Sequence, residues 1–281
     1  MPHRLGFSTL GCPKWPWAKV LEQASALGYQ GIELRGLEGE MDLTKRPEFS
    51  ALRLAETKRS LADRGLVITD LGSSARMHER EPSKRATQLD EAQRFIDLAH
   101  NLGAPWIRVF PDAYFPDEPR DHTQQRIGQT LAELGAFARG SGVGVLVESH
   151  GALTDSASLV AVMKAASGAP NVGLVWDTHH TVVEGHEQPA DTWAALGKWV
   201  HHTHIKDSVA RGKERHYVLT GQGTVGVQAI VQALVRGGYD GFFGFEWEKA
   251  WHPDIDEPEV AFPQYIETMK KWLQEAALSA A

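Results

Sequence analysis

The sequence is poor in cysteine, in basic charge and in long apolar runs, and each shortage excludes a class of protein. Its 281 residues contain one cysteine, Cys12, so no intramolecular disulfide can form and a reducing compartment is expected. The 29 basic residues are outnumbered by 36 acidic ones, which argues against a nucleic-acid partner. No apolar run could cross a membrane, and the N-terminal MPHRLGFSTLG lacks the core of a signal peptide. We therefore expect a cytoplasmic protein with no membrane partner.

The sequence does contain a repeated alternation of strand and helix patterns. Amphipathic stretches of helical period occupy residues 17–27, 51–62, 90–102, 127–139, 227–235 and 265–273, and several helical patterns end in glycine, a residue that stops helices. Short runs that are mostly apolar on both faces separate them, as in a buried parallel sheet. There are eight: LGFSTL (5–10), GIELR (31–35), LVITDL (66–71), WIRVF (106–110), GVLVES (144–149), GLVWDT (173–178), VHHTHIK (200–206) and FFGFEWE (242–248).

This alternation predicts an α/β protein with a single (β/α)8 TIM barrel, one domain over residues 1–281. The main alternative is an open doubly wound sheet, but the segment after the first run, STLGCPKWPW, has no glycine-rich phosphate fingerprint. Loops are predicted at 112–122 and 248–263, at the mouth of the barrel. GQGTVG (221–226) invites a phosphate-loop interpretation, but it lacks a Walker lysine, and a simple entry into the next helix is favoured.

Polar residues follow four consecutive runs, at the point where each predicted strand ends. They are Glu148, Asp177, His204 and Glu246. Each acidic residue alone is more often a helix cap or a solvated loop residue, but the ends of barrel strands converge on one mouth. Three carboxylates gathered there would repel one another, and a divalent cation would remove the repulsion. Three oxygen donors and one nitrogen donor suit Mn²⁺, Mg²⁺ or Co²⁺, with Zn²⁺ as an alternative.

The segment VHHTHIKDS (200–208) extends this candidate site, because side chains alternate along a strand. His202, His204 and Lys206 should share one face, with His202 a core histidine one layer deeper and Lys206 nearest a substrate. His201 should pack toward the helices. Asp207 should either cap a following turn or hold Lys206 or a ligand histidine.

The same alternation pairs Glu148 with His150 and Glu246 with Glu248. One member of each pair can be a ligand while the other reaches toward a substrate. For Glu248, a solvated loop carboxylate is an equal alternative.

The motifs resemble the xylose-isomerase-like barrel superfamily, also called the sugar phosphate isomerase/epimerase family, over nearly the whole chain. The matching segments are GFSTLGCPKW, GYQGIELR, VLVESHG, VWDTHH, HTHIKD and GYDGFFGFEWE. The resemblance implies one divalent metal ion bound by Glu148, Asp177, His204 and Glu246, with the two glutamates moving a proton. It also implies that His180 contacts the substrate.

We therefore expect a metal-dependent isomerase or epimerase of a sugar or keto-sugar that acts through a metal-stabilised enediolate. The expected partner is a small carbohydrate, and a homo-oligomer is left open. The candidate substrate-binding residues are His180, Lys206, His150 and Glu248. Trp15, Trp247 and Trp251 could line a sugar face or pack in the core.

Three alternatives remain. One is a lyase or dehydratase of a keto-sugar or inosose on the same site, with His150, Glu248 or His252 as an extra acid. Another is an abasic-site endonuclease, which the acidic balance disfavours, and the third is a barrel that binds a sugar or metal as a regulator. Ketose 3-epimerases carry a glutamate where this chain has Thr154, and an arginine where it has Ala210. These two departures weaken a literal ketose 3-epimerase assignment.

Overall fold

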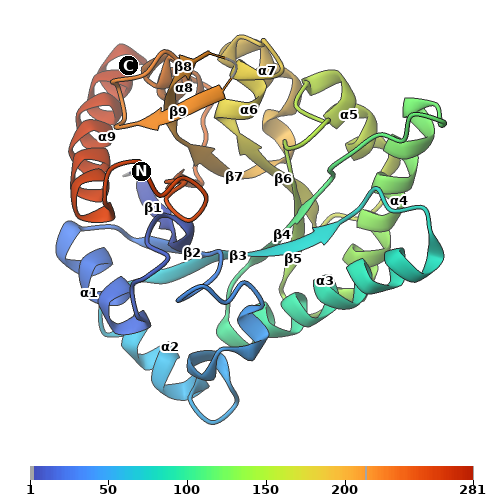
Figure 1. Ribbon diagram of the computed structural model, residues 1–281, viewed down its shortest axis with the longest axis horizontal. Coiled ribbons are helices and arrows are strands. Elements are labelled where there is room, and N and C mark those ends of the chain that lie inside the picture. Colours follow the sequence, from blue (N-terminus) through green and yellow to red (C-terminus); the bar gives the residue numbers. More distant parts are fainter. Residues whose placement is uncertain (1–2, 213, 281) are drawn as a thin grey trace.

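The computed structural model describes residues 3–212 and 214–280, so the predicted domain of residues 1–281 extends over four residues outside the description. Eight parallel strands form a closed barrel in the order β1-β10-β7-β6-β5-β4-β3-β2. Helices surround the strands in a ring (Figure 1). The predicted (β/α)8 TIM barrel is confirmed. Among the described helices, none combines the length and apolarity needed to cross a bilayer.

Each barrel strand is followed along the chain by helical structure. The strands are β1 (Arg4–Ser8), β2 (Gly31–Leu34), β3 (Val67–Arg76), β4 (Trp106–Phe110), β5 (Gly144–Glu148), β6 (Val172–Asp177), β7 (Val200–Ile205) and β10 (Phe242–Phe245). The helices are α1 (Trp17–Leu27), α2 (Leu54–Ala62), α3 (Pro82–Leu102), α4 (Arg120–Phe137), α5 (Ser156–Ala165), α6 (Thr178–Val183), α7 (Pro189–Leu196), α8 (Val227–Arg236) and α9 (Pro258–Ala280).

The strands are buried on both faces because the barrel interior and the helix ring cover them. Every residue of β2, β5, β6 and β10 is buried. Aromatic packing joins the last strand to the last helix: the rings of Phe245 and Tyr265 stack at 4.2 Å, and Phe262 packs against Phe7 at 4.5 Å. Burial on both faces explains why the sequences of the strands are nearly continuous apolar runs.

Several elements differ from the sequence prediction. Helix α9 begins at Pro258, inside the predicted loop 248–263, because proline is well suited to the first turn of a helix. Helix α4 begins at Arg120, so the predicted loop 112–122 is shorter than expected. After β7 the chain forms an unpredicted antiparallel hairpin of β8 (Asp207–Arg211) and β9 (Glu214–Val218).

Asp207 organises the loop between this hairpin and α8. Its buried carboxylate accepts hydrogen bonds from the backbone N–H groups of Gly221, Gly223 and Val225, at 2.9, 3.0 and 3.3 Å. A Cβ atom at Gly223 would lie 2.0 Å from Asp207 Oδ1, so only glycine fits there. Asp207 therefore caps a turn, one of its predicted roles. Three backbone N–H groups of GQGTVG are thus bonded to this carboxylate, and those of Gln222 and Thr224 donate to the carbonyl oxygens of Leu219 and Ser208.

We expect Asp207→Ala to destabilise the fold, because three backbone donors lose their acceptor. The free energy of unfolding should fall by about 2–4 kcal/mol in urea denaturation. Asp63→Ala, which removes an exposed carboxylate at the end of α2, is the matched control and should leave the midpoint nearly unchanged. Equal midpoints for the two variants would show that the loop does not depend on Asp207.

Candidate functional site

The four predicted metal-ligating residues meet at the C-terminal mouth of the barrel. Glu148 is the last residue of β5, Asp177 is the last of β6, His204 is the penultimate residue of β7, and Glu246 follows β10 directly. The register pairs Asp177 with His204 across neighbouring strands. One ligand atom from each residue lies within 4.8 Å of those from the other three, and all four side chains are buried. The structure thus brings together the residues predicted from the strand ends.

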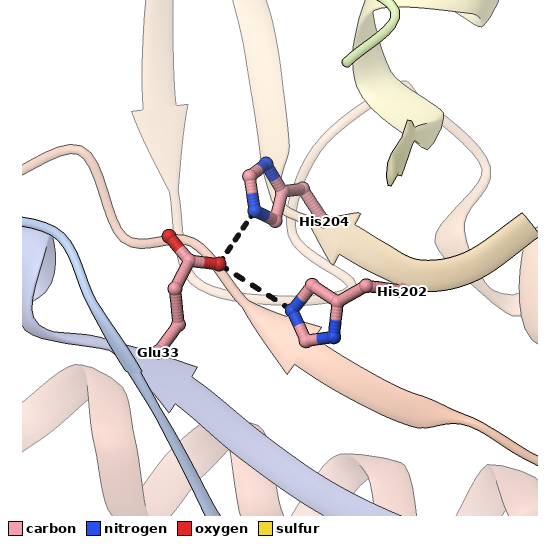
Figure 2. Close-up of side chains that lie close together, drawn as sticks. All are labelled: Glu33, His202 and His204. Carbon is pink, nitrogen blue, oxygen red and sulfur yellow. Dashed lines mark hydrogen bonds and ion pairs between the residues drawn. The ribbon is translucent and has the colours of Figure 1, made fainter. Parts of the chain in front are cut away.

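His204 points its two ring nitrogens at different carboxylates. Nε2 lies 2.6 Å from Glu33 Oε2, as Figure 2 shows, and the hydroxyl of Ser8 donates to the other oxygen of Glu33 at 2.9 Å. Nδ1 lies 3.3 Å from Glu148 Oε1 and 3.2 Å from Glu246 Oε1. When Nε2–H donates to Glu33, the lone pair of Nδ1 faces the carboxylate cluster, the orientation that a metal-binding histidine needs.

Asp177 serves the fold and the site with different oxygens. Its Oδ1 accepts from the backbone N–H groups of His179 and His180 at 2.9 and 3.1 Å, and so caps the start of α6. Its Oδ2 faces the cluster and accepts from Lys206 Nζ at 2.6 Å. The helix-cap alternative and the proposed ligand role are therefore compatible in this residue.

Lys206 is a fully buried cation among three carboxylates. Its Nζ donates to Asp177 at 2.6 Å and to Glu248 Oε1 at 2.8 Å, and it also bonds to Glu246 Oε2. His204 approaches the other oxygen of Glu246, Oε1. Glu248 is therefore a buried, paired carboxylate and not a solvated loop residue.

Arg108 on β4 completes the charge pattern and was not predicted from the sequence. Its Nε lies 3.1 Å from Glu148 Oε2, and its Nη1 donates to the carbonyl oxygen of Ser73 at 2.7 Å. The side chain is only 1% exposed. A lone arginine in the middle of the apolar run WIRVF was the available signal.

The pKa directions show how crowded the carboxylates are. Burial alone would raise the pKa of Glu148, but the positive charges of Arg108 and His204 outweigh it and hold that pKa well below its usual range. Burial raises the pKa of Glu246 to about 8; the charges of Glu248 and Glu148 act in the same direction, and those of His204 and Lys206 oppose it. A divalent cation among these groups would favour their ionised forms.

A cavity of about 220 Å³ opens onto this cluster. The two glutamates of the cluster line it, whereas Asp177 and His204 lie behind its wall. All four predicted substrate-binding residues also line it: His150, His180, Lys206 and Glu248. The residues of the wall that were not predicted to bind substrate include Arg35, Arg108, Phe110 and Tyr217.

The two histidines that line the cavity, His150 and His180, each form a hydrogen bond through Nδ1. His180 Nδ1 lies 2.8 Å from the carbonyl oxygen of Ser149, so Nδ1–H donates there. His150 Nδ1 lies 2.9 Å from Asp112 Oδ1. Burial alone would lower the pKa of His150, but the hydrogen bond to Asp112 and the charge of Glu148 outweigh it and raise the pKa.

Of the three tryptophans considered from the sequence, Trp251 lines the cavity, and it is 55% exposed. The other two are buried, and their indole N–H groups are bonded elsewhere: Trp15 to Glu259 and Trp247 to the carbonyl oxygen of Asp256. These two pack in the core.

His202 lies one layer below the cluster, as predicted. Its Nε2 is 3.4 Å from Glu33 Oε2 and 3.5 Å from Asp70 Oδ1, and the side chain is buried (Figure 2). A Cβ atom on the neighbouring Gly244 would lie 2.9 Å from this nitrogen, so glycine makes room for the ring. Glu33, which joins both histidines, was not singled out from the sequence. An acidic residue inside the buried run GIELR was its signal.

The donor set fits a divalent metal ion. Three carboxylates and one imidazole nitrogen at mutual distances within 4.8 Å match the ligand preferences of Mg²⁺, Mn²⁺ and similar ions. Two other groups of donors are equally close, Glu33/His202/His204 and Asp177/His179/His180. Each shares a residue with the first group, but neither contains more than one carboxylate. The role of Glu148, Asp177, His204 and Glu246 as ligands remains a prediction.

Barrel and cluster together define a (β/α)8 protein with donors of the kind that bind divalent metals at the mouth. A profile of the family described as Xylose isomerase-like TIM barrel matches residues 21–275, and the chain belongs to this family. The resemblance predicted from the motifs is thereby confirmed.

Two relatives of known activity are similar to this chain. Fructoselysine 3-epimerase of Shigella flexneri is 23% identical over 279 residues, which cover 97% of this chain and 99% of that protein. Inosose dehydratase of Lacticaseibacillus casei is 25% identical over 206 residues, 63% of this chain and 66% of that protein.

Two solved structures share the fold. An L-ribulose 3-epimerase has a TM-score of 0.80 at 18% identity, with 99% of this chain and 97% of that chain covered. A xylose isomerase-like TIM barrel protein of Mycobacterium smegmatis in complex with magnesium has a TM-score of 0.71 at 21% identity, with both chains covered completely. At these identities the structures show the fold alone.

We expect the protein to bind one divalent metal ion per chain, and His204→Ala to abolish that binding. At a metal concentration about 100-fold above Kd, binding should stabilise the fold by about 2.7 kcal/mol, a shift that thermal denaturation with Mn²⁺, Mg²⁺, Co²⁺ or Zn²⁺ would detect. His122→Ala removes an exposed histidine on α4 and should keep the full shift. A wild-type midpoint that no metal changes, with no heat of binding in calorimetry, would contradict the predicted site.

Proposed function

We propose that this protein is a divalent-metal-dependent epimerase or isomerase of a sugar or keto-sugar. The observation that carries the proposal is the placement of two glutamates from different strands. Glu148 and Glu246 both line the cavity and both lie beside Nδ1 of His204. The similarity to an epimerase and to a dehydratase, both named for carbohydrate-like substrates, supports the same chemistry.

The reaction we propose is proton transfer beside a carbonyl group. A divalent ion held by the four donors would supply a Lewis acid that stabilises the negative charge of the enediolate. One glutamate removes the proton, and the same or the opposite glutamate returns it. Delivery by the same residue to the neighbouring carbon of the enediolate gives isomerisation, and delivery to the original carbon from the other face gives epimerisation.

The remaining cavity residues orient the substrate. The neutral form of His180 offers Nε2 as an acceptor, because its Nδ1–H is bonded to Ser149. Glu248 accepts from Lys206 with Oε1, so its other oxygen can accept from a sugar hydroxyl group, while Lys206 spends its three N–H donors on carboxylates and holds Glu248 at the cavity wall. Trp251 offers an apolar ring to the face of a sugar.

A dehydratase or lyase is the second candidate, and the His150–Asp112 pair favours it. His150 lines the cavity two residues beyond Glu148, and Asp112 raises its tendency to carry a proton. After proton removal, such a group can protonate a leaving hydroxyl. Mass spectrometry separates the candidates: epimerisation and isomerisation leave the substrate mass unchanged, whereas dehydration removes one water.

We expect Glu246→Gln to lower the rate of proton exchange from a substrate carbon by about 10²- to 10⁴-fold, the usual contribution of a general acid or base. Substrate affinity should stay largely intact. The readout is incorporation of deuterium from heavy water into a panel of ketoses, ketose phosphates and inososes, measured by NMR with the metal-loaded enzyme.

Glu22→Gln, which changes an exposed glutamate on α1, is the control and should exchange at the wild-type rate. Wild-type exchange in Glu246→Gln would remove Glu246 from proton transfer. Absence of exchange from every compound in the wild-type enzyme would argue for a binding protein.

We expect a chelator to abolish exchange, because the carboxylate cluster needs a cation to hold substrate oxygens. Dialysis against EDTA should remove activity, and stoichiometric Mn²⁺, Mg²⁺ or Co²⁺ should restore it. Full activity in protein that atomic absorption shows to be metal-free would contradict metal dependence.

A further inference from the structure

Arg35, directly after β2, is a buried cation that forms no ion pair with a carboxylate of the described residues. Its side chain lines the cavity, and the residue is 7% exposed. Within residues 3–212 and 214–280, its guanidinium makes one hydrogen bond, a long one of 3.4 Å from Nη1 to the carbonyl oxygen of Gly72. The other two cations of the cavity wall are paired, Arg108 with Glu148 and Lys206 with three carboxylates. Arg35 therefore stands apart from the charge pairs around it.

An unpaired buried charge is costly, because the guanidinium loses water without gaining an anion in return. Burial lowers the pKa of Arg35 to about 10, with the charge of Arg108 acting in the same direction and those of Glu148, Glu33 and Glu246 opposing. The group is thus still a cation at neutral pH. Its donors face a cavity where a ligand can bind.

The surroundings hold this guanidinium in place. A Cβ atom at Gly72 would lie 2.7 Å from Arg35 Cδ and 2.9 Å from Arg108 Nη2, so both arginines pass close to that glycine. The ring of Phe110 lies 3.9 Å from the Arg108 guanidinium carbon and 5.8 Å from that of Arg35. A planar fork of N–H donors fixed in this way suits a planar carboxylate or a phosphate.

We infer that the substrate carries an anionic substituent and that Arg35 binds it. The identity of the rest of the substrate as a sugar or keto-sugar rests on the proposed function. The substituent is a carboxylate or a phosphate, and the cavity of about 220 Å³ favours the smaller carboxylate. The substrate class is therefore an acidic keto-sugar or keto-cyclitol. Its charged end contacts Arg35, and its reacting carbons reach Glu148 and Glu246.

The test measures binding to the metal-loaded enzyme by calorimetry, with matched probes that differ in one substituent. D-Fructuronate, D-fructose 6-phosphate and D-fructose form one set, and D-glycerate and glycerol form a smaller pair that is independent of the hexose skeleton. The anionic member should bind about 10- to 100-fold more tightly than its neutral partner, the usual worth of a charged hydrogen bond. Arg35→Met should abolish this preference, and Arg35→Lys should retain part of it.

Arg64→Met is the matched control, because Arg64 is exposed beyond α2 and its removal should leave the preference unchanged. If Arg35→Met fails to fold, the affinities of Arg35→Lys provide the test. Lysine keeps the positive charge but lacks the planar pair of N–H donors, so the preference for the anion should be smaller. Tighter binding of the phosphate than of the carboxylate, lost in Arg35→Met and reduced in Arg35→Lys, supports the inference with phosphate as the anion. No anion preference in either set, or a preference that Arg35→Met retains, would overturn it.

The readout separates this inference from the proposed function. Binding is measured without turnover, so absence of deuterium exchange would remove the proposed reaction and leave an Arg35-dependent anion preference standing. Conversely, exchange by the wild-type enzyme that proceeds equally with neutral and acidic substrates, and that Arg35→Met leaves unchanged, would keep the proton chemistry and remove the anion site.

Discussion

The mouth of this barrel depends on the balance of buried charge. Five carboxylates from four segments are withdrawn from water there, and each must meet a cation or a strong donor: Glu33, Glu148, Asp177, Glu246 and Glu248. Lys206, Arg108 and His204 lie between them at hydrogen-bonding or ion-pair distances. In a poorly hydrated interior such attractions are stronger than in solvent, and so are the repulsions when a partner is missing. This balance sets which atoms face the cavity and which face the core.

The fold and four of its site residues could be read from the sequence for the same physical reason. Parallel strands inside a helix ring must be apolar on both faces, so polar residues are conspicuous where the runs stop. The charged residues within the runs were harder to interpret. Glu33 lies inside GIELR, Arg35 ends that segment, and Arg108 lies inside WIRVF. The sequence position of a single charged residue in a strand does not show which residues of other strands it contacts.

The predicted element boundaries were wrong in segments that are polar or contain proline. The hairpin β8–β9 is largely hydrophilic, so no apolar alternation marked it. The predicted loop 248–263 contains two prolines, yet the helix predicted over 265–273 starts earlier, at Pro258, and includes the buried Phe262. Two aspartates had both a capping role and a site role as possible interpretations, and the structure gives a different answer for each. Asp177 uses one oxygen as a helix cap and one toward the cluster, whereas Asp207 is committed to the loop that follows.

The contact between His204 and Glu33 joins β7 to β2, which lie on different sides of the closing strands β10 and β1. All four proposed ligands come from the second half of the chain, yet the group that orients the histidine comes from the first. A fragment comprising only the later strands would carry every ligand and still lack the support for its imidazole. The closed barrel is thus required to complete the site. A chimera of half-barrels from related proteins would have to preserve the contact between His204 and Glu33.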